Sequence, residues 1–502
     1  ADTPTLVRDE TFTDTPKAIN EVVGMRYALF RSGNDFVDTG EIVGYTLASP
    51  WKYAASPTEK TSTRITAAYR RSDISGITTN DEGRRIATIT DWASPVELFA
   101  VHQNRRQYFK QYNDPRTGAE GLVREERLKT VAEQVGELVG RSYWLKRDEN
   151  NPDIFVDTGI VRGYSAGYGA SYNNIRMIAS YDSRDIKDIV NGFVVPQDGL
   201  ADSISPVDIL CTLYEGRTMY FKPVYDPRTD LEGLVREERI DTMADSKDEI
   251  IGESFELVPG EGDNWVDTGR LIGRTVGTGY TYKGARISAS YLAEQFEEVS
   301  GDKKFARPRA GANPAEMFTL YKGVSNYFNF ATVKGKNVMV RDARISLTAH
   351  ELHEIIGMRF GLALDPAANN FTDSGEVLGY MVGSGNTFNG VRISESYDAS
   401  DVTLAEEKDR NTILLYNALG LKVPPIAIPN GNGDPIELMT VYRGNSVYFK
   451  PWTDPATMER SLVLDERAAV IAKDAGDIIG VRSRLNRIGN AYTKLSFDDP
   501  NR

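Results

Sequence analysis

The sequence predicts a β-rich α+β protein made of four tandem units of about 105–120 residues, followed by a partial fifth unit. A segment whose first residue and closing glycine lie 18 positions apart occurs five times. Between these segments, an Asp-Thr-Gly or Asp-Ser-Gly motif and an apolar-aromatic hairpin recur four times in the same order. Each unit is therefore expected to be a mostly antiparallel sheet or sandwich of five to six strands with one short helix.

These landmarks divide the chain into residues 1–117, 118–230, 231–336 and 337–458, with residues 459–502 as the partial unit. A unit of this length can bury its own hydrophobic core, whereas about 40 residues cannot. The partial unit is therefore expected to pack on the fourth unit or on a partner.

Each recurring segment is expected to begin as a strand and to continue as a helix of two to three turns. In the third copy Ile240, Met243 and Ile250 have helical spacing. In the first copy Thr15 precedes Pro16, a typical helix start. The closing glycine fits the left-handed position that ends many helices. The predicted helix C-caps are Gly24, Gly140, Gly252, Gly357 and Gly480.

Residues 36–45 read FVDTGEIVGY, and Asp-Thr-Gly is also what an aspartic protease presents at its paired carboxylates. A dyad needs two copies, whereas this chain has four. The following residues, Glu41, Ile160, Arg270 and Glu376, do not suit a hydrogen-bonded catalytic loop. A tight hairpin turn explains the motif better, because aspartate accepts backbone hydrogen bonds and glycine supplies a positive φ. The predicted turns lie at Asp38 and Gly40, Asp157 and Gly159, Asp267 and Gly269, and Asp373 and Gly375.

Two apolar-aromatic strands joined by a short polar turn are expected at residues 97–112, 209–224, 317–331 and 438–452. Residues 405–421 have a helical pattern and are expected to form a surface insertion.

The formal net charge of −13, with no basic run longer than an arginine pair, disfavours binding to nucleic acid. No apolar run reaches the roughly 18 residues of a membrane span, so no membrane insertion is expected. The single cysteine, Cys211, cannot close an intrachain disulfide. The N-terminus shows no signal-peptide pattern, which leaves open whether a signal peptide has been removed.

Metal and sugar sites are weakly indicated. The sequence HELHE contains His350 and His353 at i, i+3, whereas the zinc-protease pattern needs i, i+4, so a solvated helix face is expected. The oxygen-rich loop with Asp148, Asn150 and Asp153 makes calcium the one candidate cofactor, although an Asx-rich turn explains the loop better.

Four similar units without a recurring catalytic set indicate a structural protein, for which neither catalytic residues nor a cofactor are expected. The favoured interpretation is a virion accessory of a phage: a capsid decoration protein, head fibre or tail component. Its partners would be a capsid or tail protein, or copies of itself, bound with avidity through several units. The alternative is a secreted surface-layer or adhesin protein at the extracellular surface, binding glycan or calcium through tyrosine-rich loops that include Tyr168 and Tyr280. An aspartic-type hydrolase is third.

Overall fold

The computed structural model describes residues 6–495 except 14–15, 33–34, 60, 114–119, 199, 201–203, 227–230, 298–303, 334–335, 406–425, 432–433, 454, 456, 468–471 and 473. Strands make up 69% of it and helix 3%, with no helix of seven residues or more. The β-rich prediction is thus confirmed, and the helix expected in each unit is wrong. Helical structure in the described part consists of the 3₁₀ turns η1 (Arg71–Asp73), η2 (Ser183–Asp185), η3 (Ala293–Gln295) and η4 (Ala399–Asp401).

Each recurring segment contributes two antiparallel strands that lead into a longer one. The first strands are β1 (Leu6–Thr11), β9 (Glu120–Arg127), β17 (Leu231–Arg239), β23 (Lys336–Arg344) and β31 (Arg460–Arg467). The second strands are β2 (Val22–Ser32), β10 (Leu138–Arg147), β18 (Ile250–Pro259), β24 (Ile355–Asp365) and β32 (Gly480–Ile488). The long strands are β3 (Asp35–Ala54), β11 (Ile154–Tyr172), β19 (Asn264–Tyr282) and β25 (Asn370–Phe388), and the short β33 (Ala491–Lys494) follows β32.

The rest of the sheet follows each long strand. Its antiparallel neighbours are β4 (Thr63–Arg70), β12 (Ile175–Asp182), β20 (Ala285–Leu292) and β26 (Val391–Asp398). Next come the predicted hairpins, β7 (Glu97–His102) with β8 (Arg105–Asn113), β15 (Asp208–Tyr214) with β16 (Arg217–Asp226), β21 (Glu316–Tyr321) with β22 (Val324–Val333), and β29 (Glu437–Tyr442) with β30 (Asn445–Thr453). Small separate hairpins are β5 (Ile74–Thr79) with β6 (Arg85–Ile89), β13 (Ile186–Val190) with β14 (Phe193–Pro196), and β27 (Val402–Ala405) with β28 (Ile426–Pro429).

Parallel pairs close the antiparallel ribbon on itself four times, three of them between successive long strands and the fourth between β25 and the short β33. Closed sheet 1 runs through β3, β4, β7, β8, β9, β10 and β11, and β11 returns to pair in parallel with β3, Phe155 opposite Tyr53. Closed sheet 2 runs from β11 to β19, closed sheet 3 from β19 to β25, and closed sheet 4 from β25 to β33. Each of β11, β19 and β25 therefore belongs to two closed sheets.

Each closed sheet has its own hydrophobic core, because alternate residues of every strand point inward. In closed sheet 1 the core includes Ile65, Phe109, Leu122 and Phe155. The cores of closed sheets 2, 3 and 4 include Met177 and Phe221, Ile287 and Phe328, and Ile393 and Phe449, respectively.

These cores cross the unit boundaries expected from the sequence. The boundary between residues 117 and 118 falls between β8 and β9, inside closed sheet 1. The partial unit supplies β31, β32 and β33 to closed sheet 4, where Leu464, Leu485 and Tyr492 join the core. The strands β31, β32 and β33 therefore pack on the strands of the fourth unit. The insertion expected at residues 405–421 lies, apart from Ala405, outside the described residues.

A loop held by an acidic side chain stands where each helix was expected. The Glu21 carboxylate accepts hydrogen bonds from the backbone N–H groups of Lys17 and Ala18, at 2.8 and 3.0 Å. Glu137, Glu249 and Glu354 accept two equivalent bonds each. The residue before each glutamate has a positive φ, which a helix interior excludes: Asn20, Gly136, Asp248 and His353.

The closing glycines are strand residues, so their assignment as helix C-caps is wrong. A Cβ at Gly24 would lie 2.6 Å from the carbonyl oxygen of Glu10 on the neighbouring strand. For Gly140, Gly252, Gly357 and Gly480 the corresponding distances to a carbonyl oxygen are 3.0, 3.3, 3.5 and 3.0 Å. Close approach of a neighbouring backbone therefore explains the glycine, most strongly at Gly24.

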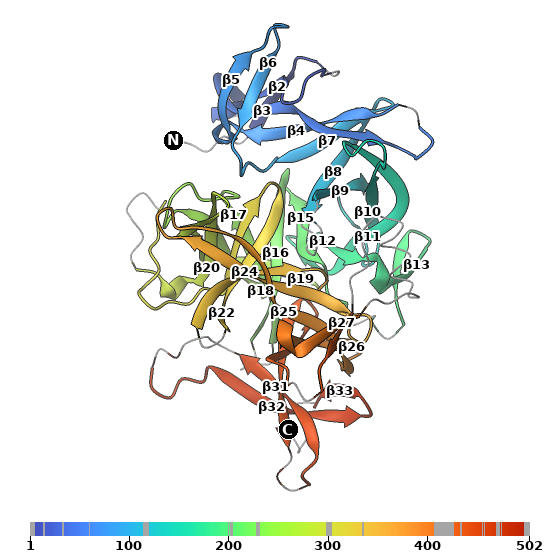
Figure 1. Cartoon of the computed structure of the whole chain (residues 1–502), viewed down its shortest axis with the longest axis vertical. Coiled ribbons are helices and arrows are strands. Elements are labelled where there is room, and N and C mark those ends of the chain that lie inside the picture. The colour runs from blue at the N-terminus through green and yellow to red at the C-terminus, as the bar shows by residue number, and fades with distance from the viewer. Residues whose placement is uncertain are drawn as a thin grey trace.

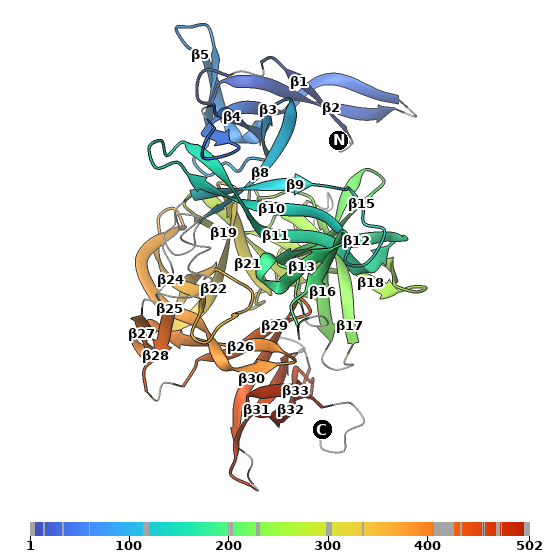
Figure 2. The ribbon, with the colours of Figure 1, turned by 90° about the vertical axis from the view of Figure 1, so that its right-hand side faces the viewer.

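Closed sheets that are not consecutive also contact one another. The turn between β21 and β22 of closed sheet 3 donates the Gly323 N–H to Ser94 Oγ of closed sheet 1, at 2.8 Å. The turn between β29 and β30 of closed sheet 4 donates the Gly444 N–H to Ser205 Oγ of closed sheet 2, at 3.1 Å. The N-terminal strands β2 and β3 lie at one end of the long axis and β31–β33 at the other (Figures 1 and 2).

Candidate functional site

The Asp-Thr-Gly motif forms a bulge within a long strand. Both flanks of the first copy pair with β2, with Ile42 opposite Tyr27 and Asp38 opposite Leu29, so residues 39–41 have no partner in the register. The flanks do not pair with each other, and the predicted hairpin is therefore wrong. The predicted positive φ is present, at +76° for Gly40, and Gly159, Gly269 and Gly375 have +70°, +70° and +80°. Bulges of this kind re-aim side chains, here the aspartate.

Each aspartate of the motif is paired with an arginine from the first strand of the same segment. The Arg Nε to carboxylate distances are 2.6 Å for Arg8–Asp38, 2.5 Å for Arg124–Asp157, 2.5 Å for Arg236–Asp267 and 2.7 Å for Arg341–Asp373. In the first three copies the glycine N–H also donates to the aspartate. A protease dyad instead shares one proton between two carboxylates.

The pKa shifts agree with this ionic role. The Gly40 N–H and then Arg8 hold the pKa of the Asp38 carboxyl below its usual value. Burial alone would raise the pKa of Asp373, but hydrogen bonds from Tyr282 and Arg341 outweigh it and lower the pKa. Both carboxylates are therefore ionised acceptors at neutral pH.

A tyrosine from the preceding long strand completes two of these pairs. The Tyr53 hydroxyl donates to Asp157 at 3.3 Å, and the Tyr282 hydroxyl donates to Asp373 at 2.5 Å. Tyr53 and Tyr282 stand at the parallel pairings that close sheets 1 and 3. The Arg-Asp-Tyr group thus joins the two strands at which a closed sheet meets itself, and its chemistry is that of a structural joint.

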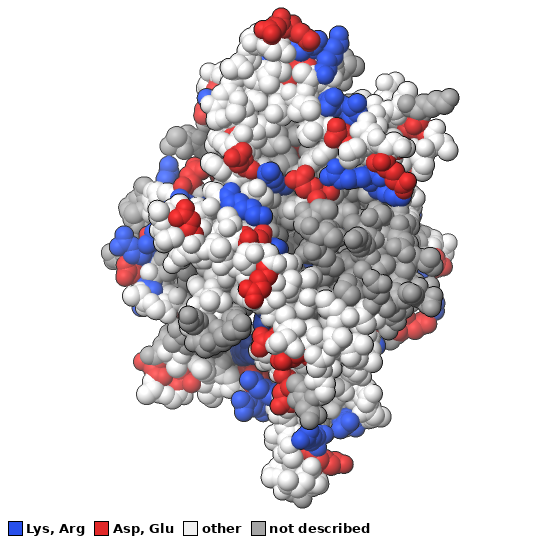
Figure 3. Space-filling model, in the orientation of Figure 1, with Lys and Arg blue, Asp and Glu red and all other residues white. Residues whose placement is uncertain are grey.

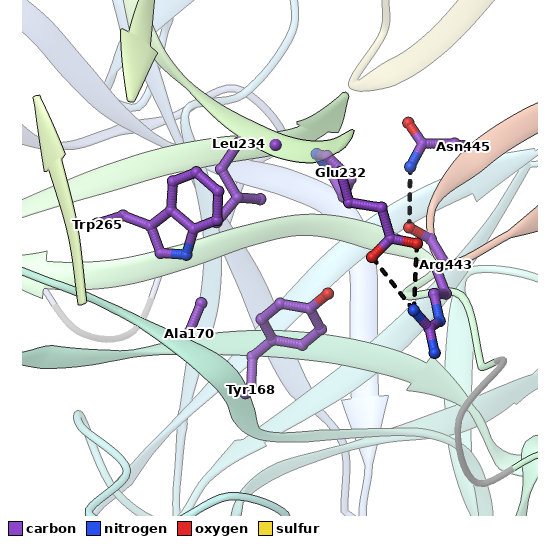
Figure 4. A pocket seen from close by; sticks show the side chains of 10 residues that line it. Tyr168, Ala170, Glu232, Leu234, Trp265, Arg443 and Asn445 are labelled. Atoms are coloured by element: carbon purple, nitrogen blue, oxygen red, sulfur yellow. Dashed lines mark hydrogen bonds and ion pairs between the residues drawn. The ribbon is translucent and has the colours of Figure 1, made fainter. Parts of the chain in front are cut away.

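A pocket of about 310 Å³ lies between closed sheet 2 and the β29–β30 turn of closed sheet 4. Tyr168 and Trp265 present aromatic rings, and the Arg443 guanidinium pairs with Glu232 at 3.2 Å (Figure 4). Burial and the nearby Glu232 carboxylate raise the pKa of Tyr168, so its hydroxyl remains a donor. Aromatic faces beside a carboxylate and a guanidinium offer both stacking and hydrogen bonding to a polar ligand.

A second pocket, of about 90 Å³, lies between closed sheet 1, the β17–β18 loop of closed sheet 2 and Leu320 of closed sheet 3. Arg70 pairs there with Asp241, and Asp73 and Asp245 face the same space. Burial raises the pKa of both Asp73 and Asp245. This pocket is smaller and more acidic than the first.

The predicted metal candidates occupy turns. Asp148 accepts hydrogen bonds from the N–H groups of Asn150 and Asn151, both at 2.9 Å, and Asn151 accepts from Asp153 N–H at 3.2 Å. These contacts form an Asx-type turn. Within the described residues no three His, Cys, Asp or Glu side chains gather as a metal site.

The HELHE sequence is a loop, so the helix face predicted for it is wrong. His353 has φ of +61°, and the His350 ring lies 3.4 Å from Asp185 of η2. The described residues also contain no helix with the length and hydropathy of a membrane span.

Sequence reasoning missed the arginine of the joint and the glutamate that holds each loop. A signal for the arginine was present. The first four segments place arginine third, at Arg8, Arg124, Arg236 and Arg341, and each precedes an Asp-Thr-Gly or Asp-Ser-Gly motif. In the fifth segment Leu464 replaces the arginine and Lys494 occupies the aspartate position by register. Paired residues that change together indicate a contact.

A comparison of the sequence with protein-family models gives no match, and neither does a comparison with curated proteins.

Proposed function

We propose that this chain is a non-enzymatic structural protein built of tandem repeats, and that it serves as a virion accessory such as a capsid decoration, head fibre or tail component. The observation that carries the proposal is the interlocking of closed sheets that are not consecutive. Closed sheets 1 and 3, and 2 and 4, meet through the same turn-to-serine contact. These contacts fix each closed sheet against another, so that the chain holds a defined shape. A chain of fixed shape can bind a partner through several surfaces at once.

The repeated geometry of the Asp-Thr-Gly and Asp-Ser-Gly copies supports the same function. Each carboxylate accepts from an arginine in the wall of a sheet, which is a stabilising use of the motif. The face of the molecule in Figure 3 carries acidic and basic side chains close together, without a broad basic area of the kind that holds nucleic acid. Protein surfaces are therefore the partners proposed here.

Quantitative mass spectrometry of purified phage particles tests this function. The chain is expected at a fixed copy number relative to the major capsid or tail protein, and to remain bound through density-gradient purification. A chain that is absent from particles, or that varies freely in amount between preparations, would contradict the virion assignment.

A secreted glycan-binding protein is the second candidate, and the pocket between closed sheets 2 and 4 favours it. Tyr168 and Trp265 line this pocket together with Glu232, Arg443 and Asn445. Binding to a glycan array that is lost in Tyr168→Ala would support it. Tyr280→Ala is the matched control, because Tyr280 packs on Phe371 in a different closed sheet and outside this pocket. Equal binding by both variants would exclude the pocket.

A further inference from the structure

The first three strands, β1, β2 and the first part of β3, form an open sheet whose inner face is exposed. Leu6 and Phe36 on this face are 47% and 43% exposed. Their counterparts in closed sheet 1, Leu122 and Phe155, are 0% and 1% exposed. The same positions are buried in the core of closed sheet 1. The exposed face of β1–β3 therefore has the composition of a hydrophobic core whose covering strands are not provided by the described chain.

The ion pair on this face is exposed in the same way. The side chains of Arg8 and Asp38 are 43% and 33% exposed, whereas those of Arg124 and Asp157 are 14% and 6% exposed. The Arg8–Asp38 pair is nevertheless assembled, at 2.6 Å, with the Gly40 N–H donating to Asp38. In closed sheets 1 and 3 the equivalent aspartate also accepts from a tyrosine of the preceding long strand. The site at Asp38 is thus ready to accept a hydroxyl group.

Strand β1 also presents a free edge. Among the described residues it pairs with β2 alone, whereas its counterpart β9 pairs with β10 on one side and with β8 on the other. The register there places Leu122 opposite Gln111. An open edge beside an apolar face is a surface to which another chain can add strands. The strands β1 and β2 lie at one end of the molecule (Figure 2).

The opposite end of the molecule is closed by a dedicated contact. Lys494 of β33 stands at the aspartate position and pairs with Glu466 at 2.7 Å. The Tyr225 hydroxyl of closed sheet 2 donates to the same Glu466 carboxylate at 2.8 Å. Within the described chain each hairpin that could cover β1–β3 already covers the strands of its own closed sheet, the last of them β29–β30 with β31–β33. A second copy therefore offers only its own β1–β3 face, which has no strands equivalent to β4, β7 and β8.

We propose that the β1–β3 face docks a different protein, one that supplies an antiparallel β element with an apolar inner face. One strand of the partner runs parallel to Asp35–Val37 and places an aromatic residue, preferably tyrosine, opposite Phe36. The tyrosine hydroxyl donates to Asp38, and a second partner strand pairs with the free edge of β1. This inference rests on the proposed assembly function and names its docking surface and the chemistry of the partner.

A chain extended by a surrogate partner tests whether this face accepts such an element. A duplicate of residues 43–119, which in the chain covers β9–β11, is fused directly before Pro4 of the full chain. Amide hydrogen exchange in residues 6–11 and 35–38 is expected to slow at least about tenfold, since edge amides become paired. Phe36→Asp should abolish this protection, and Tyr53→Phe in the duplicate should reduce it. Ile488→Asp, which changes an exposed residue of β32, is the matched control.

Photo-cross-linking in the native assembly identifies the occupant. A benzophenone amino acid replaces Phe36 in one preparation and Ile488 in another. The expected product joins position 36 to an aromatic strand residue of another protein, with position 488 giving no such product. Cross-linking of position 36 to a second copy of this chain would overturn the proposal, as would unchanged exchange in the extended chain. Position 36 could cross-link to another protein although this chain has no fixed copy number in phage particles. That result would contradict the virion function and support the docking surface.

Discussion

At the scale of single residues, the Arg-Asp pair recurs in all four copies of the motif. The same two residue types meet at nearly the same distance in four places, but their exposure differs. The Asp157 side chain is 6% exposed and that of Asp38 is 33% exposed. A charge that is buried needs its partner, whereas an exposed one is solvated by water.

Replacing Asp157 with asparagine should therefore destabilise closed sheet 1 strongly. The change keeps the side-chain oxygen but leaves the Arg124 guanidinium without its carboxylate inside the sheet, a loss of about 3–5 kcal/mol. The matched change Asp38→Asn should lower the free energy of unfolding much less. Urea unfolding followed by fluorescence gives both values. Equal losses for the two variants would show that burial does not set the strength of the joint.

A carboxyl group at the contact between η2 of closed sheet 2 and the β23–β24 loop of closed sheet 3 should make stability depend on pH. Burial, reinforced by Asp182 and opposed by Arg184, raises the pKa of Asp185 to about 7 from 3.8. From the opposite side His350 and Glu354 face this turn. A raised pKa in the folded state means that the contribution to stability is complete below about pH 4 and is lost as the pH rises through 7.

The melting temperature should therefore fall between pH 5 and pH 8 more steeply in the parent chain than in Asp185→Asn, which stays neutral. Differential scanning calorimetry at constant ionic strength measures the two slopes. Parallel slopes would assign the pH dependence to other groups.

At the scale of elements, the tight turns of the predicted hairpins carry the contacts between closed sheets. Both central residues have positive φ, for example Arg443 at +49° and Gly444 at +78°, the geometry of a type I′ turn. A Cβ at Gly444 would lie 2.7 Å from Cγ of Pro223 in closed sheet 2. Gly216, in the corresponding turn of closed sheet 2, has φ of +75° and no atom within 4 Å of such a Cβ.

Gly444→Ala should consequently cost more than Gly216→Ala. Both variants place alanine at positive φ, at a cost of about 1–2 kcal/mol, but only the first also pushes closed sheet 4 away from closed sheet 2. Limited proteolysis and thermal unfolding should show earlier separation of closed sheet 4 in Gly444→Ala alone. Identical behaviour of the two variants would mean that the turn does not fix this contact.

The hairpins could be predicted from the sequence and the helices could not, for local physical reasons. Alternating apolar residues around Glu215-Gly216 or Lys322-Gly323 leave one simple solution, a type I′ hairpin. The apparent helical spacing of Ile240 and Ile250 has another origin. Ile250 and Ile251 are neighbouring strand residues that are both buried. The loop before them is held by the Glu249 carboxylate, which accepts hydrogen bonds from two backbone N–H groups. A carboxylate that satisfies two backbone donors removes the need for a helix there.

The closed sheets themselves were beyond sequence reasoning, because their closure depends on parallel pairs between residues about 100 positions apart. Phe155 meets Tyr53, and Phe371 meets Tyr282. Nothing in either local pattern specifies that partner. The positive φ of the Asp-Thr-Gly glycine was predicted correctly. The bulge around it was not predicted, because it depends on the register between β2 and β3.

The final strand β33 is short, and a single side chain should decide whether it stays in place. Lys494 pairs with Glu466 in the sheet, and its Nζ also contacts the Tyr225 hydroxyl of closed sheet 2. Lys494→Met should accelerate amide exchange in residues 491–494, because the strand loses both polar contacts. Lys187→Met, which removes the exposed pair with Asp198, is the control and should leave exchange at β33 unchanged. Unchanged exchange in both variants would contradict a locking role for Lys494.

At the scale of the whole molecule, the two ends differ in kind. The C-terminal strands close the last sheet and are tied to closed sheet 2, while the N-terminal strands expose apolar residues and an ion pair. The serines that accept the turn amides, Ser94 and Ser205, are followed by proline, and the matching Xaa-Pro positions in closed sheets 3 and 4 hold Asn313 and Asp434. The two ends of the described chain thus differ, because β31–β33 are covered by other strands while the β1–β3 face is exposed.

Cryo-electron microscopy of the native assembly would show whether this chain is a structural component attached through its N-terminal strands. Ordered copies in fixed number are expected, with strands of another protein covering Leu6 and Phe36 and continuous with β1. Copies attached through another surface, with the β1–β3 face open to solvent, or particles from which the chain is absent, would contradict this expectation.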